Sequence, residues 1–165
     1  MNAKDAIRSS ANVSSMVLKS YISDLDDADL MRRPTEGCNH LAWQLGHLIA
    51  SEVHLLEQAA PGSGSSVALP DGFAEAHSKE ASSNDDPAGF HGKEIYVELY
   101  DKVREASLAA LDALPESDLD NESPEGMRDF CPSVGDLFAL IAVHPMMHAG
   151  QFVIVRRQLG KPILM

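Results

Sequence analysis

Four long segments with helical periodicity dominate the sequence, and strand patterns are almost absent. Within each segment, apolar residues recur at intervals of three and four, the spacing that places side chains on one face of an α-helix. The predicted helices cover residues 3–25, 39–60, 93–114 and 134–159. Four such helices bury their apolar stripes most simply against one another. We therefore predict an all-α fold, an antiparallel up-and-down four-helix bundle in which the second and fourth helices run in the same direction.

Residue types at the predicted helix ends support these boundaries. Asn2 and Ser133 precede the first and fourth helices, and both types accept hydrogen bonds from free amides at a helix N-terminus. Pro115 follows the third helix and stops it, because proline has no N–H to donate. Gly160 and then Pro162 close the fourth helix.

The connections between the helices differ in length and composition. Residues 24–34 and 116–132 are acidic, and the first of these is expected to be a solvated turn rather than a cation site. Residues 62–92 are rich in Gly, Ser, Asp and Pro and lack periodicity, apart from a short helical turn near 73–78. This long loop between the second and third helices is either a functional cover or a mobile excursion.

The composition limits the class of protein. The chain has 165 residues, 44% of them hydrophobic, which suits one domain over residues 1–165. The chain has 25 acidic and 13 basic residues, and the resulting net charge of −12 argues against nucleic-acid or membrane-surface binding. No uninterrupted apolar run reaches the ~18 residues of a membrane-spanning helix. The N-terminus leads into no apolar signal segment, so we expect a cytoplasmic protein.

The two cysteines, Cys38 and Cys131, precede the second and fourth helices. They are too few for a disulfide scaffold. In an up-and-down bundle these helices start at the same end, so we expect the two thiols to lie near one another. Small buried or loop thiols are favoured over a redox pair, because no neighbouring residue indicates a lowered thiol pKa.

His144 and His148 lie four residues apart in the apolar fourth segment. This spacing places both imidazoles on one helix face, where two nitrogens can bind one metal ion. Buried, hydrogen-bonded core histidines are the alternative, and a third histidine on another helix would favour the metal. His47 and His54 on the second helix are both within reach when depth is counted at about 1.5 Å per residue, so the count does not choose between them.

Three other histidines and one proline complete the pattern. His40 belongs to the first turn of the second helix, where a capping or surface role is expected. His77 and His91 lie in the long loop and approach a site only if that loop folds back. Pro145 cannot donate to the carbonyl of Ile141, so the fourth helix should bend or bulge there. This kink either adjusts the paired histidines around a metal or is a tolerated packing feature.

Three motifs resemble those of the DinB/YfiT-like superfamily of metal-dependent enzymes, in the same order and spacing. They are Trp43-Gln44-Leu45-Gly46-His47-Leu48, the segment from His144 to His148-Ala149-Gly150-Gln151, and Arg156-Arg157-Gln158-Leu159-Gly160-Lys161-Pro162. The resemblance extends over nearly the whole chain and implies a four-helix bundle that holds a divalent metal, zinc or nickel. Carried over to this sequence, the implied ligands are His47, His144 and His148. Pro145 departs from the family pattern.

Three neutral imidazoles leave coordination positions open, which is typical of a catalytic rather than a structural metal. Members of the resembled family include transferases and isomerases that use low-molecular-weight thiols. The resemblance therefore implies a metal-activated thiolate that attacks an electrophile. We expect a thiol-dependent S-transferase or a hydrolase. The alternative is a non-catalytic metal-binding or dimeric helical interaction module.

Three further residues are candidates for the surroundings of the metal. Glu52 follows His47 by five residues and is a candidate acceptor for an imidazole proton. Gln151 and Tyr96 are candidates for lining the pocket. Solvent-facing charge and ordinary packing are the favoured alternatives for these residues.

The fourth segment carries more apolar residues than one buried stripe requires. The surplus consists of Met146, Met147, Val153, Ile154 and Val155. Because an unneeded apolar face is a candidate surface for a second copy of the chain, we predict a homodimer.

Overall fold

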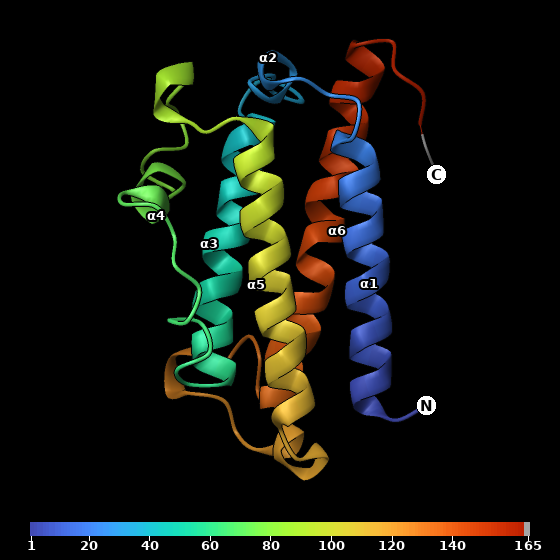
Figure 1. Cartoon of the computed structure of the whole chain (residues 1–165), viewed down its shortest axis with the longest axis vertical. Coiled ribbons are helices and arrows are strands. Elements are labelled where there is room, and N and C mark those ends of the chain that lie inside the picture. The colour runs from blue at the N-terminus through green and yellow to red at the C-terminus, as the bar shows by residue number, and fades with distance from the viewer. Residues whose placement is uncertain (164–165) are drawn as a thin grey trace.

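A computed structural model describes residues 1–163 and shows a bundle of four long helices (Figure 1). The long helices are α1 (Ala3–Ile22), α3 (Leu41–Ala59), α5 (Lys93–Ala113) and α6 (Val134–Gln158). Short helices occupy the connections: α2 (Asp27–Leu30), α4 (Phe73–Ala76), η1 (Pro87–Gly89), η2 (Glu116–Asp120) and η3 (Glu125–Met127). Residues 1–163 contain no strand, and one isolated bridge joins Glu122 to Ser133. The all-α prediction is confirmed.

Reciprocal caps fix the starts of α1 and α6. The side chain of Asn2 accepts a hydrogen bond from the N–H of Asp5, and the Asp5 carboxylate accepts one from the N–H of Asn2. Ser133 and Asp136 form the same arrangement at α6. Each cap satisfies amides that have no partner inside the helix. Both predicted caps are confirmed.

α1 and α6 lie side by side and run in the same direction. The hydroxyl of Ser14 donates to the carbonyl of Ala142, and further along both helices Arg156 donates to the carbonyl of Tyr21. Residue numbers therefore rise together along this pair.

α3 and α5 run together in the opposite direction, so the up-and-down order predicted from the sequence is wrong (Figure 1). The first halves of both helices share one apolar cluster, and their last halves share another. The connection over residues 60–92 makes this possible. α3 has 19 residues and is about 28 Å long. An extended chain covers about 3.3 Å per residue, so the connection easily returns along the bundle before α5 begins.

The actual helix order separates the two cysteines. Cys38 precedes α3 at the end of the bundle that carries α2, whereas Cys131 lies buried at the opposite end beside Leu137 and Phe138. The expected proximity of the thiols is wrong, because it depended on α3 and α6 starting at the same end.

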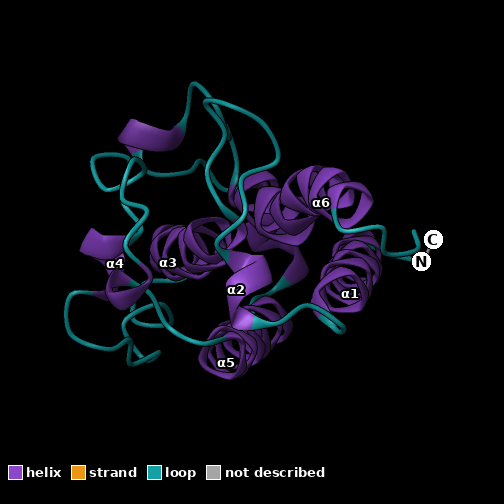
Figure 2. Ribbon diagram, turned by 90° about the horizontal axis from the view of Figure 1, so that it is seen from above, coloured by secondary structure: helices purple, strands orange, loops and turns teal. Residues whose placement is uncertain are grey.

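The crossover segment, residues 60–92, packs on the outer side of α3 (Figure 2). His77 is buried, and its ring lies so close to Gly46 that no Cβ fits there. The indole N–H of Trp43 donates to the carbonyl of Ser78 at 3.0 Å. The segment thus covers the first half of α3. This arrangement agrees with the first of the two roles predicted for the loop, a cover.

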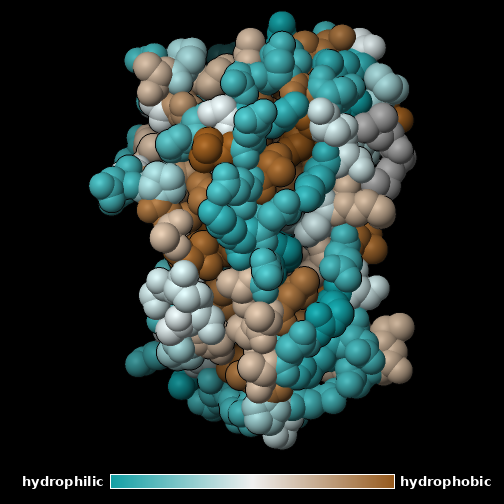
Figure 3. All heavy atoms as spheres, in the orientation of Figure 1, coloured by the Kyte–Doolittle hydropathy of each residue, from teal (hydrophilic) through white to brown (hydrophobic). Residues whose placement is uncertain are grey.

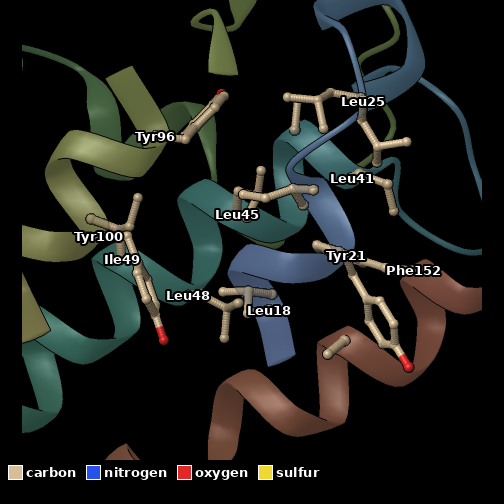
Figure 4. Packing of buried hydrophobic residues seen from close by; sticks show 14 of the residues in the cluster. Leu18, Tyr21, Leu25, Leu41, Leu45, Leu48, Ile49, Tyr96, Tyr100 and Phe152 are labelled. Carbon is tan, nitrogen blue, oxygen red and sulfur yellow. The ribbon is translucent and has the colours of Figure 1, made fainter. Parts of the chain in front are cut away.

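The core consists of two apolar clusters with a polar layer between them. The cluster near α2 includes Leu18, Tyr21, Leu25, Leu41, Leu45, Leu48, Ile49, Tyr96, Tyr100 and Phe152 (Figure 4). The second cluster includes Leu55, Leu56, Leu111, Leu137, Phe138 and Ile141. On α1, α3 and α5, buried polar residues fall between members of the two clusters: Ser14, Glu52, Arg104 and Ser107.

The acidic connection after α1 is not only a solvated turn, because one of its residues binds a buried arginine of α6. α1 ends at Ile22, three residues before the predicted end at 25, and the fully buried Arg156 donates to the carboxylate of Asp24 at 2.5 Å. The hydrogen bond from Arg156 lowers the pKa of Asp24. This acidic connection therefore anchors the C-terminal part of α6.

α6 is long and apolar enough, by length and composition alone, to cross a membrane. In the bundle it packs along α1 and α3, and its inward side chains belong to both core clusters. The core helix of a helical bundle meets the same criterion, so this is weak evidence for a membrane span. On the face that carries α5, bands of hydrophilic residues alternate with hydrophobic residues (Figure 3).

Candidate metal site

Three histidines from α3 and α6 meet on one side of the bundle. His47, His144 and His148 each offer one ring nitrogen, and these nitrogens all lie within 4.8 Å of one another. The ring centroids of His144 and His148 are 5.0 Å apart, and each lies 5.5 Å from that of His47. Zinc binds imidazole nitrogen at about 2.0–2.1 Å, so small side-chain adjustments would bring all three around one ion.

The direction of the helices explains why His47, and not His54, joins the pair on α6. Because α3 and α6 are antiparallel, the start of α3 lies beside the second half of α6. His54 lies two turns further along α3, about 10 Å away, and its side chain is exposed. The depth count from the sequence did not distinguish the two histidines because it assumed parallel helices.

Gln44 orients the ring of His148. Its Oε1 accepts a hydrogen bond from Nδ1 of His148 at 2.9 Å, while its Nε2 donates to the carbonyl of Asn39 at 2.7 Å. With the proton on Nδ1, the Nε2 atom of His148 is free to bind a metal. Gln44 was not among the residues predicted to surround the metal. Its place three residues before His47, on the same helix face, was the available signal.

The ring of His47 is held by stacking. Trp43, one turn earlier on α3, lies parallel to it with centroids 4.8 Å apart and an angle of 8° between the planes. The hydroxyl of Ser51 is 3.4 and 3.5 Å from the two ring nitrogens, at the long limit for a hydrogen bond to either. The stacked indole, itself bonded to the crossover segment, is therefore the main support of His47.

Burial keeps all three imidazoles neutral. It lowers the pKa of His148 to about 3 and that of His144 to about 4, and it also lowers the pKa of His47. Repulsion among the histidines, and by Arg104 at His144, adds to the effect of burial. The neutral imidazole is the form that binds a metal, so the cluster is ready to bind at neutral pH.

A pocket of about 510 Å³ opens beside His47 and His144. Its apolar wall consists of Ala50, Leu55, Ala74, Met127, Phe130, Leu140 and Met147. Its remaining polar lining consists of Ser51, His54, His77, Ser78 and Lys79. The described lining includes no carboxylate, although the chain carries 25 acidic residues. The volume is in the range of small-molecule binding sites.

Comparison with known families identifies the chain. The family model of the DinB superfamily matches residues 13–152, which include His47, His144 and His148. The chain belongs to the DinB superfamily. A comparison with curated proteins found no match. The resemblance seen in the motifs is thus confirmed at the level of the family.

Glu52 of this DinB-superfamily protein does not contact an imidazole. Its carboxylate accepts a hydrogen bond from the hydroxyl of Ser107 at 2.7 Å and lies 2.8 Å from the guanidinium of Arg104. Burial raises the pKa of Glu52 to about 7, opposed by both partners. Five residues correspond to about 140° around a helix, so Glu52 points away from the face of His47.

Tyr96 and Gln151 are not among the described residues that line the pocket. Tyr96 is buried behind His77, where its hydroxyl donates to Nε2 of His77 at 2.8 Å. The other nitrogen of His77, Nδ1, donates to the carbonyl of Phe73 at 2.7 Å. Gln151 is half-buried on α6. Tyr96 therefore contacts His77, which the folded-back crossover segment places in the pocket wall.

The other two histidines have structural roles in this DinB fold. His40 caps α3, because its Nδ1 accepts the N–H of Trp43 at 3.0 Å, and it is fully buried. The backbone N–H of His91 donates to the hydroxyl of Tyr96 at 3.2 Å, and its ring lies parallel to that of Phe73. Of the two roles expected for His40, the cap is confirmed and the surface position is wrong.

Proposed function

We propose that this DinB-superfamily protein is a metal-dependent enzyme in which His47, His144 and His148 hold one divalent ion, zinc or nickel. The observation that carries the proposal is the convergence of three imidazoles from two helices, two of which, His47 and His144, line a pocket. Membership of the DinB superfamily supports it.

The donor set fits such an ion. Imidazole nitrogens suit zinc and nickel, whereas calcium and magnesium prefer oxygen ligands. Gln44 holds His148 in the tautomer that exposes Nε2, which is the usual arrangement of a metal-binding histidine and its outer partner. Three protein ligands are also fewer than the four of a structural zinc site, so the set suits catalysis.

The proposed reaction is thiol-dependent S-transfer or hydrolysis. When bound, the ion supplies Lewis acidity that favours the deprotonated form of a water or thiol. The apolar wall of the pocket, including Phe130 and Met147, binds the substrate body and limits access of water. A low-molecular-weight thiol is the proposed co-substrate, in a reducing cytoplasm. Nucleic acids and membrane surfaces are not proposed partners, because the net charge is −12.

Metal content tests the first part of the proposal. The chain is purified without a histidine tag under metal-replete conditions, together with His148→Ala and His54→Ala variants. His54 is the matched control, because it lines the same pocket outside the histidine cluster. We expect about one ion per natural chain, as for a single site, its loss in His148→Ala and its retention in His54→Ala. A metal-free natural chain would contradict the proposal.

Activity tests the second part. Metal-loaded protein is screened with thiol co-substrates against a panel of electrophiles, and separately with hydrolysable esters and amides. Loss of turnover in His47→Ala is the expected result. Turnover that survives His47→Ala would contradict the assigned role.

A dimeric interaction module is the second candidate, favoured by an exposed apolar face along α1 and α6. Val13, Met16, Val143 and Met146 are each 39–53% exposed, and three of them line one shallow groove. Of the apolar surplus predicted on α6, Val155 is buried, whereas Met146, Met147 and Ile154 are exposed. We propose that a second copy of the chain covers this face. Light scattering after size exclusion should give twice the monomer mass, and a monomer at high concentration would rule the dimer out.

A further inference from the structure

Pro145 deprives one backbone carbonyl of α6 of its helical partner, between two of the three histidines. In an α-helix the carbonyl of Ile141 accepts from the N–H of residue 145, and proline has none. α6 nevertheless continues as one helix from Val134 to Gln158. A buried carbonyl without a donor is costly, so a donor from outside the helix is needed.

Arg104 of α5 supplies that donor. Its Nη1 donates to the carbonyl of Ile141 at 3.1 Å, and the residue is only 6% exposed. The next carbonyl, that of Ala142, accepts the hydroxyl of Ser14 from α1 at 2.5 Å. Two successive carbonyls in the turn before Pro145 therefore accept hydrogen bonds from neighbouring helices.

Glu52 of α3 balances the charge of Arg104. Its carboxylate lies 2.8 Å from Nη2 of Arg104 and also accepts the hydroxyl of Ser107. The same Nη2 donates to the hydroxyl of Tyr100 at 3.2 Å. A buried guanidinium needs such a partner. The network joins all four long helices around the turn that contains Pro145.

We infer that Arg104 is a positioning residue for the proposed metal site, because it holds the turn at Pro145 and so keeps His144 and His148 at their spacing. The inference rests on the proposed function, in which these two histidines bind the ion. Pro145 directly follows His144 and precedes His148 by three residues, so a change in this turn alters the distance between the two rings. Glu52 acts one step further out, by holding Arg104.

A buried ion pair that only stabilises the bundle is the competing explanation. Arg156, near the end of α6, offers a matched control, because it is also buried and forms an ion pair, with Asp24. If Arg104 only stabilises, Arg104→Met and Arg156→Met should have the same kind of effect, on unfolding alone.

The test compares a pair of substitutions made together, Glu52→Gln and Arg104→Met, in the natural chain and in a Pro145→Ala background. Pro145→Ala restores the backbone N–H of residue 145, which can donate to the carbonyl of Ile141. The donor from Arg104 is then no longer needed. Zinc affinity is measured by competition with a chromophoric chelator, and the visible spectrum of the cobalt-loaded protein reports coordination geometry. We expect the pair to weaken zinc binding on the order of 10- to 100-fold and to change the cobalt spectrum. We expect most of both effects to disappear with Pro145→Ala.

Equal losses in both backgrounds, or an unchanged zinc affinity and cobalt spectrum, would overturn the inference. Arg156→Met should lower the urea midpoint without changing the cobalt spectrum. If the pair does not fold, Arg104→Lys replaces it in the same two backgrounds, because lysine keeps the charge opposite Glu52 but lacks the planar fork of donors.

Unfolding of the metal-free chain separates this inference from the proposed function. The effects of Arg104→Lys and Pro145→Ala on the urea midpoint should be non-additive. Pro145→Ala gives the carbonyl of Ile141 a helical donor, so weakening the donor from Arg104 should then cost less. Additive effects would overturn the link between Arg104 and Pro145. Non-additive effects in a chain that binds no zinc would support this link and contradict the metal site.

Discussion

Each of the three candidate ligands is held by a different kind of contact. A hydrogen bond to Gln44 fixes the ring of His148, and stacking on Trp43 fixes that of His47. His144 depends on the turn of α6 in which the carbonyl of Ile141 accepts a hydrogen bond from Arg104 of α5. Ligands held in place before the ion arrives lose less freedom on binding, so these supports should contribute directly to metal affinity.

Replacement of Gln44 should therefore weaken metal binding. Gln44→Leu removes the acceptor for Nδ1 of His148, and the loss of such an outer partner typically costs about 10- to 100-fold in affinity. Gln151→Leu is the control, because Gln151 lies on α6 three residues after His148 but outside the described pocket lining. Zinc titration in competition with a chelator measures both variants. Equal affinities for the two would contradict the role of Gln44.

His77 should make the metal-free protein sensitive to mild acid. Burial lowers its pKa from an ordinary 6.5 to about 4. Between these values the unfolded chain binds a proton that the folded chain does not, so stability is full above pH 6.5 and falls as the pH drops toward 4. The contribution of His77 is at most about 3 kcal/mol. His77→Gln should flatten the decline of the urea midpoint over this range, and an unchanged slope would contradict the prediction.

The lengths and ends of the helices were predictable, whereas their directions were not. Periodicity together with the Asn2 and Ser133 caps located the long helices to within about three residues, within the accuracy expected of such boundaries. The composition of residues 62–92 showed a long irregular loop, but a loop of that length permits either a parallel or an antiparallel return. Contacts between the loop and α3, such as that of His77 with Gly46, distinguish the two returns. Such contacts depend on tertiary packing.

At the scale of helix packing, two glycine substitutions should have opposite effects. Gly46→Ala places a methyl group against the ring of His77 and should destabilise the protein by about 1–3 kcal/mol, as overpacking does. Gly150→Ala meets nothing within 4 Å and should stabilise α6 by up to about 1 kcal/mol, because alanine favours helix. Urea unfolding measures both. An unchanged stability in Gly46→Ala would show that the crossover segment does not depend on this contact.

Across the whole molecule, the crossover makes α3 antiparallel to α6 and so places His47 beside the second half of α6. The cluster of His47, His144 and His148 was predictable, because the i, i+4 pair and the family motifs both indicated it. Gln44 and Arg104 were not identified, since their contacts cross between helices and depend on how each helix is rotated. Neither role considered for Glu52, an acceptor for an imidazole proton or a solvent-facing charge, anticipated its buried pairing with Arg104, for the same reason.

Anomalous X-ray scattering from crystals of the metal-replete, tag-free protein tests the metal site most directly. Data collected on either side of the zinc and nickel absorption edges would locate an ion and identify it. We predict a single peak about 2.0–2.1 Å from nitrogens of His47, His144 and His148, with further coordination facing the pocket. Data from metal-replete crystals with no peak among these histidines, or with the ion bound elsewhere, would contradict the site.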